Sequence, residues 1–122
     1  MTNNPIRVAG VFGFLAVLLG AFGAHFLKSR ITPELLVSFQ TGVHYHLAHA
    51  LALLALALSN RPFPRVFLAW TIGICIFSGT LYLYALTGSK VFAMITPLGG
   101  MCLMAGWVML AFQSNRIERK AE

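Results

Sequence analysis

The sequence predicts an all-α integral membrane protein, an up-down bundle of four transmembrane helices with both termini in the cytoplasm. Of the 122 residues, 58% are hydrophobic and only 10% are charged. Four stretches contain no Asp, Glu, Lys or Arg, at residues 8–27, 35–60, 66–89 and 91–115. Each is long enough to cross the hydrocarbon core of a bilayer, for which about 20 residues suffice. A soluble enzyme, a disulfide scaffold and a disordered chain are thereby excluded.

The first helix is predicted at about residues 6–27. Its uncharged stretch exceeds the apolar region of a signal peptide, about 7–15 residues, so we interpret it as a retained helix. Small residues recur along it at spacings of three or four, which allows close helix packing in lipid. They are Ala9, Gly13, Ala16, Gly20 and Ala24.

The other helices are predicted at about residues 33–58, 66–86 and 91–112. Thr32 is a typical N-cap for the second helix, Pro33 suits its first position, and Glu34 suits the positive first turn. Two prolines and two arginines within residues 59–65 mark the next connector. The whole chain, residues 1–122, is interpreted as one transmembrane domain with a short basic C-terminal tail.

The basic residues predict the orientation. With short connectors, consecutive helices are antiparallel neighbours. One end then carries Arg7, Arg61, Arg65, Arg116, Arg119 and Lys120, and the other carries Lys28, Arg30 and Lys90. Since cytoplasmic loops are enriched in Lys and Arg, both termini are predicted to be cytoplasmic, in a multi-pass protein of the bacterial inner membrane. The net charge of +6 then reflects contact with anionic headgroups, not nucleic-acid binding.

Polar side chains inside a span are costly and are therefore candidates for function. By the helical rise, most of them fall in the outer half of the bilayer, the half away from the termini. The candidate polar cluster is His25 from the first helix; Thr41, Tyr45 and His49 from the second; Ser78 and Tyr82 from the third; and Thr96 from the fourth. Pro97 predicts a kink in the fourth helix, because it frees a backbone carbonyl one turn earlier.

The histidines raise the alternative of a metal or haem site. His46 and His49, three residues apart, share a helix face and could ligate a metal, with His25 as a further candidate ligand. Haem needs two axial ligands facing each other, and His25 lies about 13 Å higher than His49 along the bilayer normal. No carboxylate accompanies these residues within the spans. We therefore expect no cofactor, no catalytic residue and no enzymatic activity.

Six blocks of this sequence resemble the signature of the YgdD-type family of small bacterial inner-membrane proteins. They lie at residues 20–25, 40–45, 49–54, 77–82, 96–100 and 106–107. The family is classed as a domain of unknown function and has mitochondrial relatives. The resemblance implies four transmembrane helices and supplies no activity. The matching polar residues are His25, Thr41, Tyr45, His49, Ser78, Tyr82 and Thr96, with Pro97; His44 and His46 depart from the pattern.

Three hypotheses about function follow. The leading one is a non-enzymatic membrane protein that binds a lipid-like or small ligand, or serves as an accessory subunit, through the polar outer half. Its expected partners are membrane lipids and a membrane protein or a second copy. The alternatives are a redox, metal or haem protein using His25 and His49, and a small oligomeric transporter. The unbroken apolar stretch at residues 51–58 opposes a solute pathway through a single chain.

Overall fold

The computed structural model describes residues 4–122, apart from the side chains of residues 114–118. Its four long helices and one short 3-10 turn are α1 (Asn4–His25), η1 (Leu27–Ser29), α2 (Pro33–Leu58), α3 (Pro64–Thr87) and α4 (Lys90–Ala121). Residues 4–122 contain no strand. Each long helix includes a segment long and apolar enough to cross a membrane. The predicted all-α membrane fold is confirmed.

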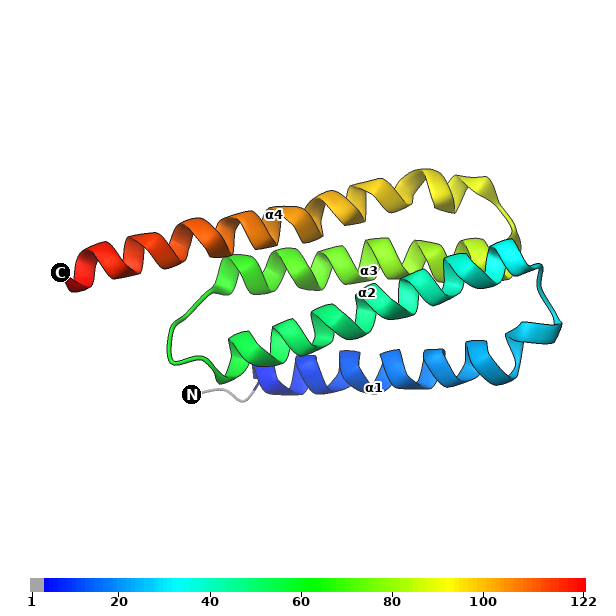
Figure 1. The fold of residues 1–122 in the computed structure, drawn as a ribbon, viewed down its shortest axis with the longest axis horizontal. Helices are drawn as coiled ribbons and strands as arrows, with labels where there is room; N and C mark the ends of the chain where they lie inside the picture. Colours follow the sequence, from blue (N-terminus) through cyan, green and yellow to red (C-terminus); the bar gives the residue numbers. More distant parts are fainter. Residues whose placement is uncertain (1–3) are drawn as a thin grey trace.

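The four helices lie side by side in a single row (Figure 1). α1 packs on α2, α2 on α3 and α3 on α4, whereas no described Cα atom of α4 lies within 8 Å of α1 or α2. The up-down order is as predicted, but α1 and α4 do not close the row into a ring. Both broad faces of the row are therefore left to the surrounding bilayer. The first turn of α1 and the last turn of α4 lie at the same end of the row, which we call the basic end (Figure 1).

The helix ends follow local capping chemistry. The Thr32 hydroxyl accepts a hydrogen bond from the Leu35 amide at 3.3 Å, so α2 begins where the sequence predicts. α3 begins earlier than predicted, because Pro64 occupies its first turn, where proline is favoured. It ends at Gly88, whose φ of 70° is the left-handed conformation typical of a glycine after a helix. α4 continues through Pro97 to Ala121, so the predicted tail is helical; the side chains of Arg116 and Glu118 lie outside the description.

Glycines bring α3 and α4 into close contact. A Cβ atom on Gly99 would collide with the backbone of Phe77, and one on Gly106 would collide with the Trp70 indole. Where helices associate in lipid, small residues of this kind allow the backbones to approach and dispersion contacts to form. Trp70 is 1% exposed and belongs to the larger core cluster, with Ala9, Leu53, Val66, Ile74 and Leu103. A second cluster, Leu27, Phe39 and Ala85, lies toward the opposite end.

Candidate functional site

Five side-chain hydrogen bonds connect α2, α3 and α4. We call this set the interhelical network. Its side chains are His46 and His49 from α2, Trp70, Ser78, Thr80 and Tyr82 from α3, and Thr96 and Trp107 from α4. Four of the five bonds involve α3, which is flanked by the other two helices. α1 contributes no side chain to the network and joins α2 by apolar packing, as where Gly20 and Gly23 meet Val43 and Phe39.

Two of these bonds join α2 to α3. His46 Nδ1 lies 2.8 Å from the Tyr82 hydroxyl, and the Ser78 hydroxyl donates to the Gly42 carbonyl at 2.7 Å. Ser78 and Tyr82 are one turn apart and therefore lie on the same face of α3. Gly42 allows this approach, since a Cβ there would come within 2.9 Å of the Tyr82 ring. The Ser78 hydroxyl thus binds a backbone carbonyl and is not paired with a base.

A pair of threonines joins α3 to α4. The hydroxyls of Thr80 and Thr96 lie 2.7 Å apart, and both residues are buried. Thr96 Oγ1 also bonds the Phe92 carbonyl one turn earlier on α4, at 3.0 Å. Thr96 immediately precedes Pro97, so its hydrogen bond to Thr80 connects the segment around the proline to α3.

His49 connects α2 to α4 and has a defined tautomer. Its Nε2 accepts a hydrogen bond from the Trp107 indole at 3.0 Å, and its Nδ1 lies 2.8 Å from the Tyr45 carbonyl. An indole N–H is only a donor and a carbonyl only an acceptor, so Nδ1 carries the proton and Nε2 does not. His49 is therefore neutral here. Trp70 packs edge-on against the His49 ring and lies 4.5 Å from Trp107, centroid to centroid.

The structure brings together only part of the predicted polar cluster. Ser78, Tyr82, Thr96 and His49 belong to the interhelical network, whereas Tyr45 contributes its carbonyl and its ring. Thr41 bonds the Val37 carbonyl of its own helix at 2.9 Å. His25 is exposed at the end of α1 and makes no side-chain hydrogen bond within the described part of the chain.

Sequence reasoning did not name three members of the network, Trp70, Thr80 and Trp107, as candidate polar residues, whereas His46 was considered mainly as a metal ligand. The two tryptophans also extend the network further toward the basic end than the sequence predicts. A general rule could have indicated them, because a buried indole N–H needs an acceptor. With no carboxylate in the spans, the acceptors available are neutral histidines, hydroxyls and backbone carbonyls.

These donor atoms do not fit a metal or haem site. Both nitrogens of His49 are used in hydrogen bonds, so ligation through Nε2 would displace Trp107. His46 Nε2 is buried without a partner, but Nδ1 of the same ring is bound to Tyr82. Among the described residues, no three His, Cys, Asp or Glu side chains are grouped as a metal site would require. The three predicted ligands, His25, His46 and His49, do not form one site.

Two polar residues of α2, Gln40 and His44, point away from the network, and the neighbouring Tyr45 packs its ring against His49 and Phe77. Gln40 and His44 are exposed, and Tyr45 is 47% exposed. None of their side chains makes a hydrogen bond within residues 4–122 for which side chains are described. At about 100° per residue, His44 lies about 160° around the helix from buried His46. We call Gln40, His44 and Tyr45 the outward polar face of α2.

The two tyrosines near this site provide a matched test of the network. Tyr82→Phe is expected to lower the free energy of unfolding by about 1 kcal/mol, because it leaves His46 without its hydrogen bond. Tyr45→Phe removes a hydroxyl that makes no hydrogen bond among the described side chains, so the purified protein should keep its stability. Unfolding by sodium dodecyl sulfate in mixed micelles, followed by circular dichroism, measures both. Equal losses for the two variants would contradict the assigned His46–Tyr82 bond.

Comparisons with known proteins identify the family. Residues 19–100 match "Protein of unknown function (DUF423)". A "UPF0382 membrane protein" of Haemophilus influenzae is 40% identical, covering 93% of this chain and 95% of that protein. The "UPF0382 inner membrane protein YgdD" of Escherichia coli K12 is 36% identical, covering 98% and 96%. The "UPF0382 membrane protein YwdK" of Bacillus subtilis is 37% identical, covering 86% and 90%.

No solved structure matches the chain at a significant level. These relatives are named as membrane proteins and match this chain along nearly their whole length, in agreement with four helices that can each span a bilayer. The expected resemblance is therefore confirmed, as is the expected location in the bacterial inner membrane. The chain belongs to the DUF423 family of small multi-pass membrane proteins, the same family as YgdD.

Proposed function

We propose that this protein is a non-enzymatic accessory subunit of a membrane-protein assembly, and that it binds a transmembrane helix of another protein through the outward polar face of α2. One observation carries the proposal. His44 is exposed, its side chain makes no hydrogen bond with the residues that the structure describes, and it lies within one turn of the midpoint of a membrane-spanning helix.

The cost of exposing these groups to lipid supports a protein partner. Hydrocarbon offers no hydrogen-bond donor or acceptor, and a polar group left unpaired there costs several kcal/mol. His44 and Tyr45 are adjacent, and Gln40 lies one turn before His44. His44 and Tyr45 lie within about 3 Å of the midpoint of α2, so roughly 12 Å separates them from either headgroup region, whereas Gln40 lies about 8 Å from the midpoint and closer to the headgroups. Ionisable side chains in spans almost always face protein or a water-filled cavity.

The properties of this face define the partner. A neutral imidazole, a phenol and an amide each both donate and accept hydrogen bonds. A complementary helix would present a Ser, Thr, Asn or Gln side chain, or a carbonyl exposed by small residues, near the middle of the bilayer. Such bonds contribute about 1 kcal/mol each, so they specify the partner while apolar contacts supply much of the affinity.

The remaining polar groups support a role without catalysis. The Ser78 hydroxyl donates to a backbone carbonyl and both nitrogens of His49 are engaged in hydrogen bonds, so neither residue belongs to a serine–histidine pair. The connectors between the helices are short, and the spans occupy most of the described chain. The surfaces offered to other molecules are therefore mainly lateral ones within the membrane.

Photo-crosslinking in native membranes tests the proposal. A photoreactive residue is placed at Ala48, which is exposed one turn after His44, and a control is placed at Val17, which is 64% exposed on α1. Two differently tagged copies of the chain are expressed together. Position 48 is expected to give an adduct between this chain and one other protein, and the same adduct should form in independent preparations. Because the partner is not a second copy of this chain, the adduct should carry only one of the two tags. His44→Leu should reduce that adduct about fivefold or more.

The other outcomes overturn the proposal. An adduct that carries both tags would make the face a contact between copies of this chain. Lipid adducts alone at position 48, or a protein adduct unaffected by His44→Leu, would show that His44 does not recognise a partner. The same protein adduct from position 17 with equal yield would indicate non-specific proximity.

A further inference from the structure

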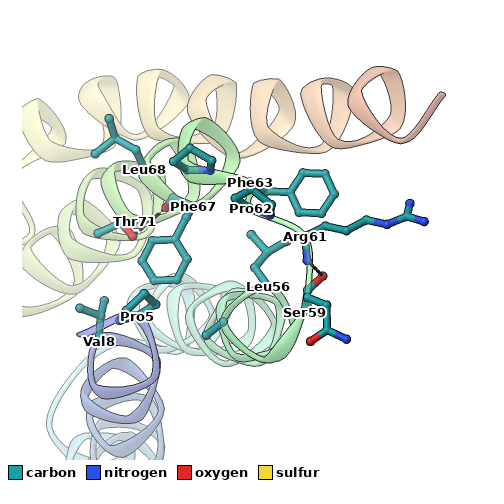
Figure 2. A pocket seen from close by; sticks show the side chains of 13 residues that line it. Pro5, Val8, Leu56, Ser59, Arg61, Pro62, Phe63, Phe67, Leu68 and Thr71 are labelled. Carbon is teal, nitrogen blue, oxygen red and sulfur yellow. Dashed lines mark hydrogen bonds between the residues drawn. The ribbon is translucent and has the colours of Figure 1, made fainter. Parts of the chain in front are cut away.

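A groove of about 850 Å³ opens at the basic end of the molecule. It lies between the first turns of α1 and α3, at the end of α2 and its connector (Figure 2). α1 packs on α2, and no described Cα atom of α1 lies within 8 Å of a Cα atom of α3. Its volume falls within the range of about 300–1,000 Å³ that is common for ligand sites. The outward polar face of α2 contributes none of its lining.

The groove is amphipathic from its interior to its rim. Val8, Leu56, Phe67 and Leu68 provide apolar lining from three helices. The rim is formed by the connector Ser59–Phe63, which includes Arg61. In Figure 2 the Arg61 side chain extends from the connector away from the apolar lining. A long cationic side chain with its charge outside the apolar region is the arrangement expected at a membrane–water interface.

The depth of the groove along the bilayer normal suits a lipid whose headgroup lies at the membrane surface. The rim connects the ends of two spans and therefore lies at headgroup level, since the connector joins α2 to α3. The lining continues to Thr71, two turns into α3, a depth of about 10 Å at the helical rise. An acyl chain can lie along this depth while its headgroup stays at the rim.

The charge at the rim selects an anion. The groove lining includes Arg61 and no acidic residue. Of the three acidic residues in the chain, Glu34 lies at the start of α2, at the opposite end, and Glu118 and Glu122 lie at the end of α4, none of whose described side chains lines the groove. Arg65, exposed in the first turn of α3, adds a second cation close by in sequence. Guanidinium groups bind phosphate with two parallel hydrogen bonds, a geometry that ammonium groups lack.

We propose that this groove binds one anionic phospholipid of the surrounding bilayer, with its phosphate at Arg61 and an acyl chain against Val8, Phe67 and Leu68. The groove is separate from the outward polar face of α2, so this proposal can be tested independently of the proposed accessory-subunit function. By holding a lipid between α1 and α3, it would add contacts between two helices whose backbones do not pack closely on each other. The lipid would thus stabilise the basic end of the row.

Lipid retention measured by native mass spectrometry tests this proposal. The full chain is reconstituted in nanodiscs of equal parts phosphatidylglycerol and phosphatidylethanolamine, then released in the mass spectrometer. One phosphatidylglycerol per chain is expected to remain, at least about fivefold more often than phosphatidylethanolamine. Arg61→Gln should bring the two lipids to equal retention. Ala57→Trp, which places an indole in the groove, should abolish retention of both.

Matched controls separate the site from general effects of charge and bulk. Lys28→Gln removes one positive charge at the opposite end, and Ala105→Trp adds an indole at an exposed position of α4. Both should retain phosphatidylglycerol as the unmodified chain does. Equal retention of the two lipids by the unmodified chain, or undiminished retention by Arg61→Gln, would overturn the proposal. Arg61 is exposed, so this second result does not depend on whether Ala57→Trp folds.

Discussion

Replacing Gly99 by alanine is expected to lower the free energy of unfolding by about 2–3 kcal/mol, whereas the same change at Gly100 leaves it unchanged or raises it slightly. The two glycines are adjacent in α4, both lie within the helix, and both face the region of Phe77. The two substitutions therefore differ only in the direction in which the new methyl group points.

The packing of α3 against α4 causes the difference. A Cβ on Gly99 would overlap the backbone of Phe77 and approach the Ile76 carbonyl carbon to 2.9 Å. Backbone atoms cannot move aside as a flexible side chain can, so the two helices must separate. A Cβ on Gly100 would lie 3.6 Å from the Phe77 ring, an ordinary contact. There, alanine also gains about 1 kcal/mol of helix propensity over glycine.

Denaturation in mixed micelles, read by helicity and by gel filtration, measures both variants. Gly79→Ala is a further control, because nothing lies within 4 Å of a Cβ at that position of α3. If Gly99→Ala unfolds at the same denaturant fraction as Gly100→Ala and Gly79→Ala, α3 and α4 are not packed as closely as the structure describes.

The fold could be predicted from the sequence where the chain carries explicit signals. The four spans follow from the gaps between charged residues, and α2 begins at Pro33 because Thr32 caps it. The helical tail was not predicted, since the end of an apolar stretch marks the edge of a membrane and not the end of a helix. Glu, Lys and Arg are good helix formers, so α4 can continue into water.

The open row could not be predicted, for a physical reason. In a soluble bundle, each helix has an apolar stripe that points to its neighbours, but a helix in lipid is apolar on all sides. The pattern therefore does not say whether α1 contacts α4. Short connectors fix only the neighbours in chain order.

The sequence was sufficient to predict several of the polar residues in the candidate site, but not which of them form hydrogen bonds with each other. The cost of polar groups in a membrane identified Ser78, Tyr82 and His49. Which donor meets which acceptor depends on the rotation of each helix, and spacing within one helix does not contain this information. The close approach of α3 to α4 at Gly106 brings in the two tryptophans, and this depends on contacts between helices.

Trp70→Ala is expected to cost about 3–5 kcal/mol, the usual range for removing a buried aromatic side chain. Trp70 is among the largest fully buried side chains of the described structure. It packs against His49 and Trp107, and its indole donates to the Leu103 carbonyl at 3.2 Å. Alanine would leave a cavity where α2, α3 and α4 meet. His49 and Trp107 would then lose the ring that packs against both.

Trp70→Phe separates the contribution of the indole hydrogen bond to stability from that of the side-chain volume. Phenylalanine keeps most of the apolar contact but cannot donate to the Leu103 carbonyl, so its cost should be about 1–2 kcal/mol. This variant also leaves Trp107 as the single tryptophan of the chain, since the sequence contains two. Its fluorescence then reports directly on the His49–Trp107 contact during unfolding. That signal should change together with helicity, because the contact joins two helices that meet only when the row is assembled. A Trp107 signal that changes well before helicity, or a Trp70→Ala variant within about 1 kcal/mol of the unmodified chain, would show that α2 and α4 are not held together through this network.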